Sequence, residues 1–239
     1  DGSLISTVGS ASAGNVRIES GADMRITGLD AGSARVSLVA GGDIADAGNS
    51  LKDVVASQLR VASGMGVALD LDVQTLSLSA GASVYLTQAH DLVIGQIDAI
   101  TVQSVDVASG ALSARTDDAM QSLITLGANS HVVLLVLDGG ITVASEQDQV
   151  DPGVRAGGNI LLQADRASAQ TEADITLDAD ILSAAGSISL FAQGSIGQNA
   201  QINVVANGKT IDLVAGGSIT MADEALTQSQ NGDVRLQAD

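Results

Sequence analysis

The chain has 239 residues, enough for one or two domains, with 27 glycines, one proline, no cysteine and only two aromatic residues, Tyr85 and Phe191. Its 28 acidic residues outnumber its 10 Lys and Arg, and a formal charge of −18 argues against nucleic-acid binding, because phosphate contacts need clustered cations. Without cysteine, disulfide scaffolds, zinc–thiolate sites and cysteine nucleophiles are excluded.

The two ends of the chain suggest a part of something longer. The sequence begins Asp1-Gly2-Ser3-Leu4 without an initiator methionine, and its last eight residues, 232–239, follow a strand pattern met earlier in the chain. We therefore expect a segment of a longer protein or a processed mature piece. No apolar run approaches the roughly eighteen residues that a membrane-spanning helix needs, so no membrane span is predicted.

One short pattern recurs from end to end: an aliphatic residue, a variable one, a second aliphatic, another variable one, then alanine and glycine. In five copies another aliphatic residue follows eight positions after the first. The predicted core ladder consists of the first aliphatic residues of the copies, Val16, Val36, Leu76, Ile160, Ile188, Ile211 and Val234, together with the later residues Ile44, Val84, Ile196 and Ile219. Weaker copies fall at Leu59, at 100–102 and at 124–126.

The alternation of apolar and polar residues within each copy is typical of strands, and no long stripe of helical period occurs. Residues 111–121 fit either a short helix or a loop. A strand unit of about 22 residues cannot bury its own apolar face, but stacked units can. We predict an all-β fold over 1–239, a single-stranded right-handed parallel β-helix (β-solenoid) of about ten coils, each of roughly 20–28 residues.

Residues 88–157 depart from the repeat. This region contains Asp117-Asp118, the apolar run Val132–Leu137 and the single proline, Pro152. We expect less regular coils or a projecting loop here, and any local binding function is expected here first, because insertions on one side of a solenoid commonly form its binding face.

The segments Ala40–Ile44 and Ala215–Ile219 resemble the repeats of filamentous-haemagglutinin-like bacterial exoproteins, as do Gly14–Val16, Gly158–Ile160 and Gly186–Ile188. The resemblance implies a β-helical shaft, secretion and display on the bacterial cell surface. It supplies no catalytic motif, and fold alone does not define function.

Calcium is the one candidate ligand, because 24 of the 28 acidic residues are Asp, whose oxygens suit this ion. The densest acidic sets are Asp70 with Asp72, Asp117 with Asp118, and Asp178 with Asp180. No EF-hand loop and no tandem glycine–aspartate nonapeptide is present. The alternative is that these residues are solvated turn residues that keep a rod soluble.

Catalysis is not expected. Arg17, Arg25 and Arg35 lie near acidic residues in sequence, and Arg17 is expected to stack on Arg35 one coil later, as on the active face of a polysaccharide-cleaving β-helix. Two aromatic rings are too few to build sugar platforms. His90 and His131 are expected in surface loops.

Three functions remain as hypotheses. The first is the stiff shaft of a secreted, extracellular bacterial adhesin or biofilm-matrix protein, flanked by further coils. The second is a filament subunit that stacks end to end with copies of itself. The third is a module that binds or cleaves polysaccharide, and host or bacterial surface glycans or proteins are its expected partners.

Overall fold

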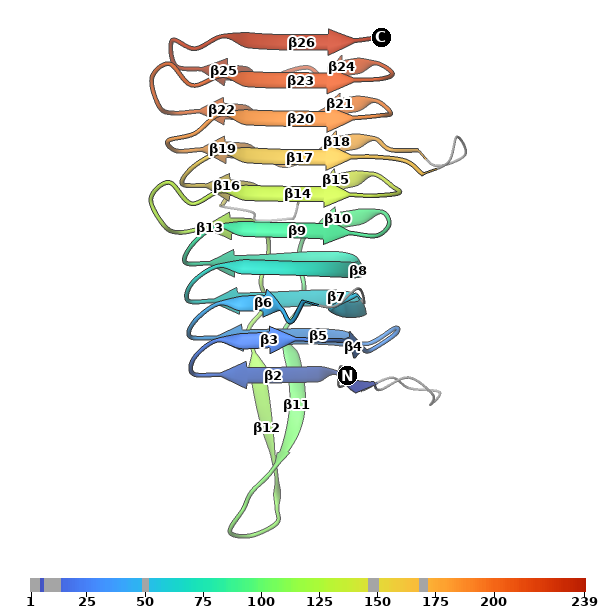
Figure 1. Ribbon diagram of the computed structural model, residues 1–239, viewed down its shortest axis with the longest axis vertical. Coiled ribbons are helices and arrows are strands. Elements are labelled where there is room, and N and C mark those ends of the chain that lie inside the picture. Colours follow the sequence, from blue (N-terminus) through green and yellow to red (C-terminus); the bar gives the residue numbers. More distant parts are fainter. Residues whose placement is uncertain (1–4, 7–13, 49–51, 146–150, 168–171) are drawn as a thin grey trace.

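The computed structural model describes residues 5–6, 14–48, 52–145, 151–167 and 172–239, and this part of the chain forms a parallel β-helix (Figure 1). No helix is found among these residues, so none is available to span a membrane. The predicted fold class, an all-β solenoid, is confirmed.

The longest ladder of parallel strands runs through nine levels of the rod. The first residues of its strands stack directly on one another, from Met24 at one end to Val234 at the other. Its strands are β3 (Met24–Ile26), β6 (Ile44–Asp46), β8 (Val67–Ala80), β9 (Val84–Gln88), β14 (Val132–Val136), β17 (Ile160–Ala164), β20 (Ile188–Ala192), β23 (Ile211–Ala215) and β26 (Val234–Ala238).

A second ladder begins with long strands and then divides into two branches. It contains β2 (Val16–Ser20), β5 (Arg35–Ala40), β7 (Val54–Ser63) and the second half of β8. One branch continues from β8 as β10 (Leu92–Ile94), β15 (Ile141–Val143), β18 (Ile175–Leu177), β21 (Ile196–Gln198) and β24 (Ile219–Met221). The other continues as β13 (Leu123–Thr125), β16 (Val154–Ala156), β19 (Ile181–Ser183), β22 (Ile202–Val204) and β25 (Thr227–Ser229).

Two smaller features complete the strand set. A third ladder joins β1 (Ile5–Ser6), β4 (Leu29–Asp30) and the first half of β7. An antiparallel hairpin, β11 (Ile100–Val105) and β12 (Leu112–Asp117), stands apart from the coils. The expectations for this segment were wrong: 100–102 is not a copy of the coil repeat, and 111–121 contains a strand of the hairpin rather than a helix or loop.

Aliphatic side chains fill the bore of the rod because every second residue of a strand points inward. Val132, Leu134 and Val136 of β14 are fully buried, and they belong to one apolar cluster that runs from β3 to β23. Tyr85, on an outward position of β9, is half exposed. A narrow bore therefore takes Val, Ile and Leu and leaves this aromatic ring outside.

The predicted core ladder is divided among three stacks of residues. Val16, Val36 and Leu76 stack in the second ladder, and Ile196 and Ile219 in its branch through β10; the other six lie in the longest ladder. Eight of the eleven are no more than 1% exposed; Val16 and Ile219 are partly buried, and Val234, in the last strand, is 41% exposed. The same short pattern occurs on different sides of the coil, so similar sequence copies do not always stack.

Coil length varies while the strand register is kept. Along the longest ladder, successive first residues are 17 to 28 positions apart, except between Val84 and Val132, where the difference is 48. The long coil contains the hairpin. Nine levels about 4.8 Å apart give a length of roughly 38 Å for this ladder.

One corner of the coil requires glycine because the backbones of neighbouring coils nearly touch there. A Cβ on Gly64 would lie 2.3 Å from the carbonyl oxygen of Gly41, and one on Gly81 would lie 2.0 Å from that of Gly64. We call this stack the glycine corner; it contains Gly21, Gly41, Gly64, Gly81, Gly127 and Gly157. A Cβ added at any of the last five would meet the coil on its N-terminal side.

Candidate functional site

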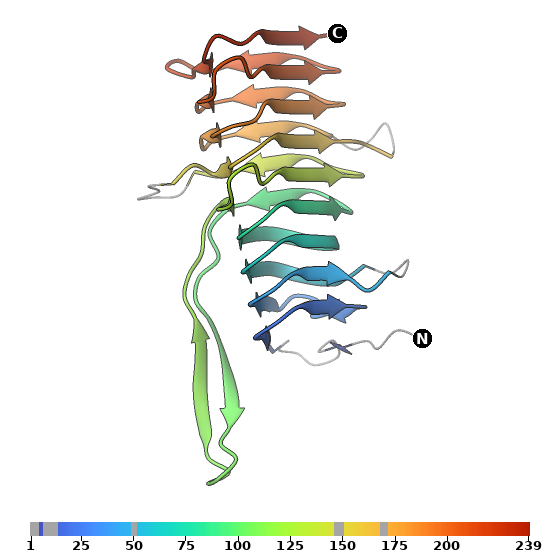
Figure 2. The same cartoon turned by 60° about the vertical axis from the view of Figure 1, so that its left-hand side comes forward.

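The hairpin β11–β12 is the most distinctive feature on the surface. It leaves the rod between β10 and β13, within the region 88–157, and turns back along the outside of the earlier coils (Figures 1 and 2). Six residue pairs hold its two strands together, from Ile100 with Asp117 to Val105 with Leu112. Its turn lies beyond β2, the first long strand of the rod (Figure 2).

A row of polar side chains on the coils anchors the hairpin. Arg17, Ser37, Arg60 and Ser77 stack on successive coils of the second ladder, and we call this row the docking track. The Ser77 hydroxyl lies within hydrogen-bond distance of two carbonyl oxygens, that of Met120 at 3.0 Å and that of Gly95, and shares its one proton between them. These bonds fix the base of the hairpin to the coil.

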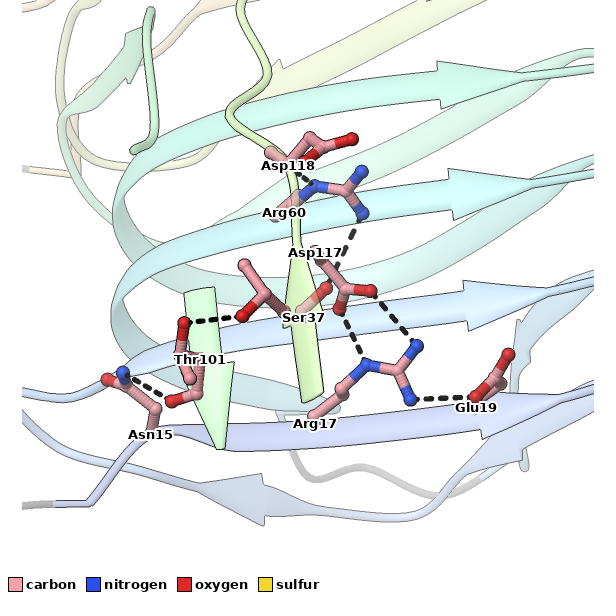
Figure 3. Close-up of polar contacts among 9 residues, drawn as sticks. Asn15, Arg17, Glu19, Ser37, Arg60, Thr101, Asp117 and Asp118 are labelled. Carbon is pink, nitrogen blue, oxygen red and sulfur yellow. Dashed lines mark hydrogen bonds and ion pairs between the residues drawn. The ribbon is translucent and has the colours of Figure 1, made fainter. Parts of the chain in front are cut away.

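Arg60 continues the attachment one coil further from that base. Its Nε donates to the carbonyl oxygen of Asp118 at 2.8 Å, and its Nη1 lies 3.5 Å from the Ser37 hydroxyl (Figure 3). The backbone carbonyls of Asp118 and Met120 are therefore held by hydrogen bonds from two adjacent coils.

The strongest contact lies at the first coil. The Arg17 guanidinium binds Asp117 through two hydrogen bonds, Nε to Oδ2 at 2.9 Å and Nη2 to Oδ1 at 3.0 Å (Figure 3). Its Nη1 also donates to Glu19 at 2.7 Å. The side chains of Arg17 and Asp117 are 17% and 9% exposed, so this ion pair is largely shielded from water. Paired geometry of this kind is the strong form of a carboxylate contact.

The local charges keep Asp117 ionised. Burial of its carboxyl group opposes ionisation, but hydrogen bonds from Arg17 and Ser37 and the positive charges of Arg17 and Arg60 outweigh burial, and the pKa of Asp117 is lowered. The hydrogen bond to Asp117 likewise raises the pKa of Arg17. The docked hairpin therefore depends on a charged carboxylate at this position.

Beyond this ion pair, one further hydrogen bond between the hairpin and the coils is found in the part of the chain that the structure describes. Asn15 Nδ2 donates to the carbonyl oxygen of Thr101 at 3.4 Å (Figure 3). Ile100 is fully buried. Towards the turn, Val105, Val107 and Leu112 are 63% or more exposed. We call residues 102–115 the distal half of the hairpin.

The acidic residues predicted from the sequence as calcium ligands are engaged separately. Asp117 binds Arg17, Asp118 accepts at its backbone from Arg60, and Asp72 lies 3.0 Å from His90. Asp178 accepts from Asn199, Asp180 accepts from the backbone of Gln201, and the backbone of Asp70 donates to Asp53. Within the described ranges no group of three or more His, Asp or Glu is placed to hold a metal ion.

The expected arginine pair does not form. Arg17 stacks on Ser37, which lies two positions after Arg35, and Arg35 stacks on Gln58. The two histidines have different partners: His90 lies beside Asp72, while Nδ1 of His131 accepts from the backbone of Asn159 at 2.9 Å.

Asp53 is a buried acid that the sequence does not reveal. Its side chain is fully buried, and Oδ1 lacks a hydrogen-bond partner among the described residues, while Oδ2 accepts from the backbone of Asp70 at 2.8 Å. Burial raises the pKa of Asp53 to about 7, and the nearby Asp46 and Asp70 raise it more weakly. The hydrogen bond from the backbone of Asp70 lowers this pKa but does not outweigh burial. It resembles any other turn aspartate in sequence, so periodicity gives no signal for it.

The fold and the site define the class as a parallel β-helix with a hairpin docked back along its own coils. Searches against protein-family models, curated proteins and solved structures found no match for this chain.

Proposed function

We propose that this chain is a structural shaft, a stiff segment that spaces or displays other parts of a secreted bacterial surface adhesin or biofilm-matrix protein. The observation that carries the proposal is the unbroken apolar core, which continues from β3 to β23 while strands pair in register on both sides of each inner coil. Bending such a rod would break ladder hydrogen bonds and open core contacts at once. Stiffness follows from this arrangement.

Two surface features support the same role. A net charge of −18 makes copies repel one another sideways, which keeps a rod with long strands from aggregating. The docked hairpin crosses the coils that contain Ser77, Arg60, Ser37 and Arg17, so it braces this end of the rod. The resemblance of the glycine-rich repeats to those of haemagglutinin-like exoproteins supports a place outside the cell.

The proposal is tested by small-angle X-ray scattering of the purified chain, combined with a glycan array. A shaft should scatter as a rod of constant cross-section and bind no glycan selectively. Cleavage of a polysaccharide, or selective glycan binding lost on substitution of one surface cluster, would overturn the proposal in favour of a polysaccharide-binding or polysaccharide-cleaving module.

A further inference from the structure

We propose that His131 makes one contact between neighbouring coils sensitive to acid, so that the rod loosens between β14 and β17 when the pH falls below about 6.5. These two strands lie on adjacent levels near the middle of the rod (Figure 1). A shaft needs no response to pH, so this inference goes beyond the proposed function. It rests on a column of polar side chains, on the proton that one contact in the column excludes, and on the groups around that contact.

The column follows one corner of the coil. Its members, polar except for one glycine, directly precede the strands of the longest ladder, and we call it the corner column: Asp23, Asp43, Gly66, Ser83, His131, Asn159, Ser187, Thr210 and Asp233. Many of its side chains accept a hydrogen bond from the backbone N–H of the next member: Asp23 from Asp43, Asp43 from Gly66, Ser83 from His131, His131 from Asn159, Asn159 from Ser187, and Ser187 from Thr210. Each such bond joins two consecutive coils.

His131 supplies the imidazole of this column, and its contact fixes where the ring carries its proton. The backbone N–H of Asn159 can only donate, so Nδ1 of His131, 2.9 Å away, must accept through a free lone pair. The ring is therefore neutral, with its single proton on Nε2. A second proton would lie on Nδ1 and would point at another donor.

The other acceptors of the corner column are less sensitive to pH. The hydroxyl oxygens of Ser83 and Ser187 and the amide oxygen of Asn159 accept at every pH. Carboxylates ordinarily keep their charge down to about pH 4. Among the described contacts of this column, only the one made by Nδ1 of His131 is expected to change between pH 5 and pH 7.5.

The corner leaves a protonated ring little room. A Cβ on Gly158 would lie 2.6 Å from Nδ1 of His131, so the ring packs directly on this backbone. On either side of the contact, Gly158 donates to the carbonyl oxygen of Ser130 at 2.7 Å, and Val132 donates to that of Asn159 at 2.9 Å. Because these bonds hold the two coils together, a protonated ring must leave its place or push the coils apart.

The charged members of the corner column lie far from His131. Its partners on either side, Ser83 and Asn159, are uncharged. Asp43 is three coils away in one direction and Asp233 four coils away in the other, roughly 14 Å and 19 Å at 4.8 Å per coil. Both distances exceed the Debye length of about 8 Å at physiological salt, so these carboxylates compensate little for a lost contact.

Titratable groups on the adjoining strands do not compensate either. Tyr85 of β9 points outward and carries a neutral phenol. Arg155 of β16, four positions before Asn159, is exposed, and its positive charge opposes a second one nearby. Lys209, next to Thr210, is three coils away and also positive.

The test follows single amides of the whole chain by hydrogen exchange and NMR near pH 5 and near pH 7.5. The quantity compared is protection, the exchange rate expected for an unfolded chain divided by the measured rate. Protection of the Asn159 amide should fall about tenfold at the lower pH, because its acceptor is replaced by a facing donor. The Ser187 amide is the internal control: it donates to the amide oxygen of Asn159, so its protection should stay the same.

Two variants make the test specific to one ring. His131→Asn introduces the residue that accepts in the same way one coil later, so the Asn159 amide should be equally protected at both pH values. His90→Asn is the matched control. His90 lies 3.0 Å from Asp72, a contact that protonation strengthens, and in this variant the Asn159 amide should remain sensitive to acid.

The ring itself gives a readout that needs no variant. Nitrogen NMR of the wild type near pH 7.5 should find Nδ1 of His131 without a proton and Nε2 with one. A proton on Nδ1, equal protection of the Asn159 amide at both pH values, or an equal loss of protection at Ser187 would overturn the inference.

Discussion

Asp117 is the residue through which the hairpin is attached to the first coil, and charge dominates the attachment. Two hydrogen bonds from Arg17 reach a carboxylate that is only 9% exposed. Removing the charge would leave Arg17 partly buried with its main partner weakened, and hydrogen bonds to charged groups contribute about 1.5–3 kcal/mol. This one pair therefore accounts for much of the docking energy.

Asp117→Asn should loosen the hairpin without unfolding the rod. We expect a loss of about 2 kcal/mol in docking, seen as roughly thirtyfold faster amide hydrogen exchange in β11 and β12 and unchanged exchange in β17 and β20. Asp118→Asn is the matched control, because only the backbone carbonyl of Asp118 is used by Arg60. Equal exchange in the two variants would show that the ion pair does not hold the hairpin.

Asp53, unlike Asp117, favours the folded rod when its carboxyl group is protonated, because that group is buried. Its pKa in the folded chain, about 7, lies above the value of about 4 expected when unfolded. The stabilisation of the folded chain by protonated Asp53 is complete below pH 4. It falls as the pH rises towards 7 and is lost above pH 7. Asp53 therefore destabilises the rod at neutral and alkaline pH relative to a neutral residue.

Asp53→Asn should raise the melting temperature at pH 8 and change it little at pH 4. The amide oxygen can still accept from the backbone of Asp70, and its NH₂ group can donate to Asp46. We expect a gain of at least about 1 kcal/mol at pH 8, measured by thermal unfolding followed by circular dichroism. A similar change at both pH values, or a gain also in Asp118→Asn, would contradict the assignment.

At the scale of the element, the glycine corner decides how closely the coils approach. Five carbonyl oxygens of this corner, on Gly21, Gly41, Gly64, Gly81 and Gly127, each lie within 2.5 Å of where the next coil's Cβ would be. The constraint comes from neighbouring backbone, which cannot move aside without shifting a whole coil.

Gly81→Ala should be strongly destabilising, because its Cβ would lie 2.0 Å from the carbonyl oxygen of Gly64. We expect a loss of about 3 kcal/mol in the free energy of unfolding, measured with urea. Gly21 belongs to the same corner but has nothing within 4 Å of an added Cβ, so the stability of Gly21→Ala should match that of the wild type. Equal losses in both variants would show that close approach is not the cause.

The elements also show where sequence patterns predict structure and where they do not. Alternation predicts the strand at Ile188–Ala192 correctly, and the length of the apolar run predicts the strand at Val132–Val136. Alternation does not show on which side of the coil a strand lies. It also assigns 100–102 to the repeat, although these residues begin the hairpin. The contact of Arg17 with Asp117 joins residues 100 positions apart, which no local pattern reveals.

At the scale of the whole molecule, length along the axis depends on the number of complete coils. The registers place Ile211 directly on Ile188 and Ile188 directly on Ile160, so each of these coils is an equivalent layer. Stability in such arrays comes from contacts between neighbouring layers.

Removing one complete coil should shorten the rod by about 4.8 Å and leave it folded. Deletion of 188–210 removes β20, β21 and β22 and brings Ile211 into the place of Ile188. Deletion of 188–199, which removes only part of that coil, is the control and should abolish cooperative unfolding, because later strands lose their register. Scattering gives the length and circular dichroism the transition; equal behaviour of the two deletions would contradict layered stacking.

The coil between Val84 and Val132 separates length in sequence from length in space. It uses 48 residues to climb one level, where other coils use 17 to 28, and the strands above and below it keep their registers. Longer sequences of this kind can therefore differ in two independent ways. Whole coils lengthen the rod, whereas insertions at the corner between β10 and β13 add surface structure without changing the length of the rod. Evolution or design can therefore change the surface insertion of such a rod while its length stays the same.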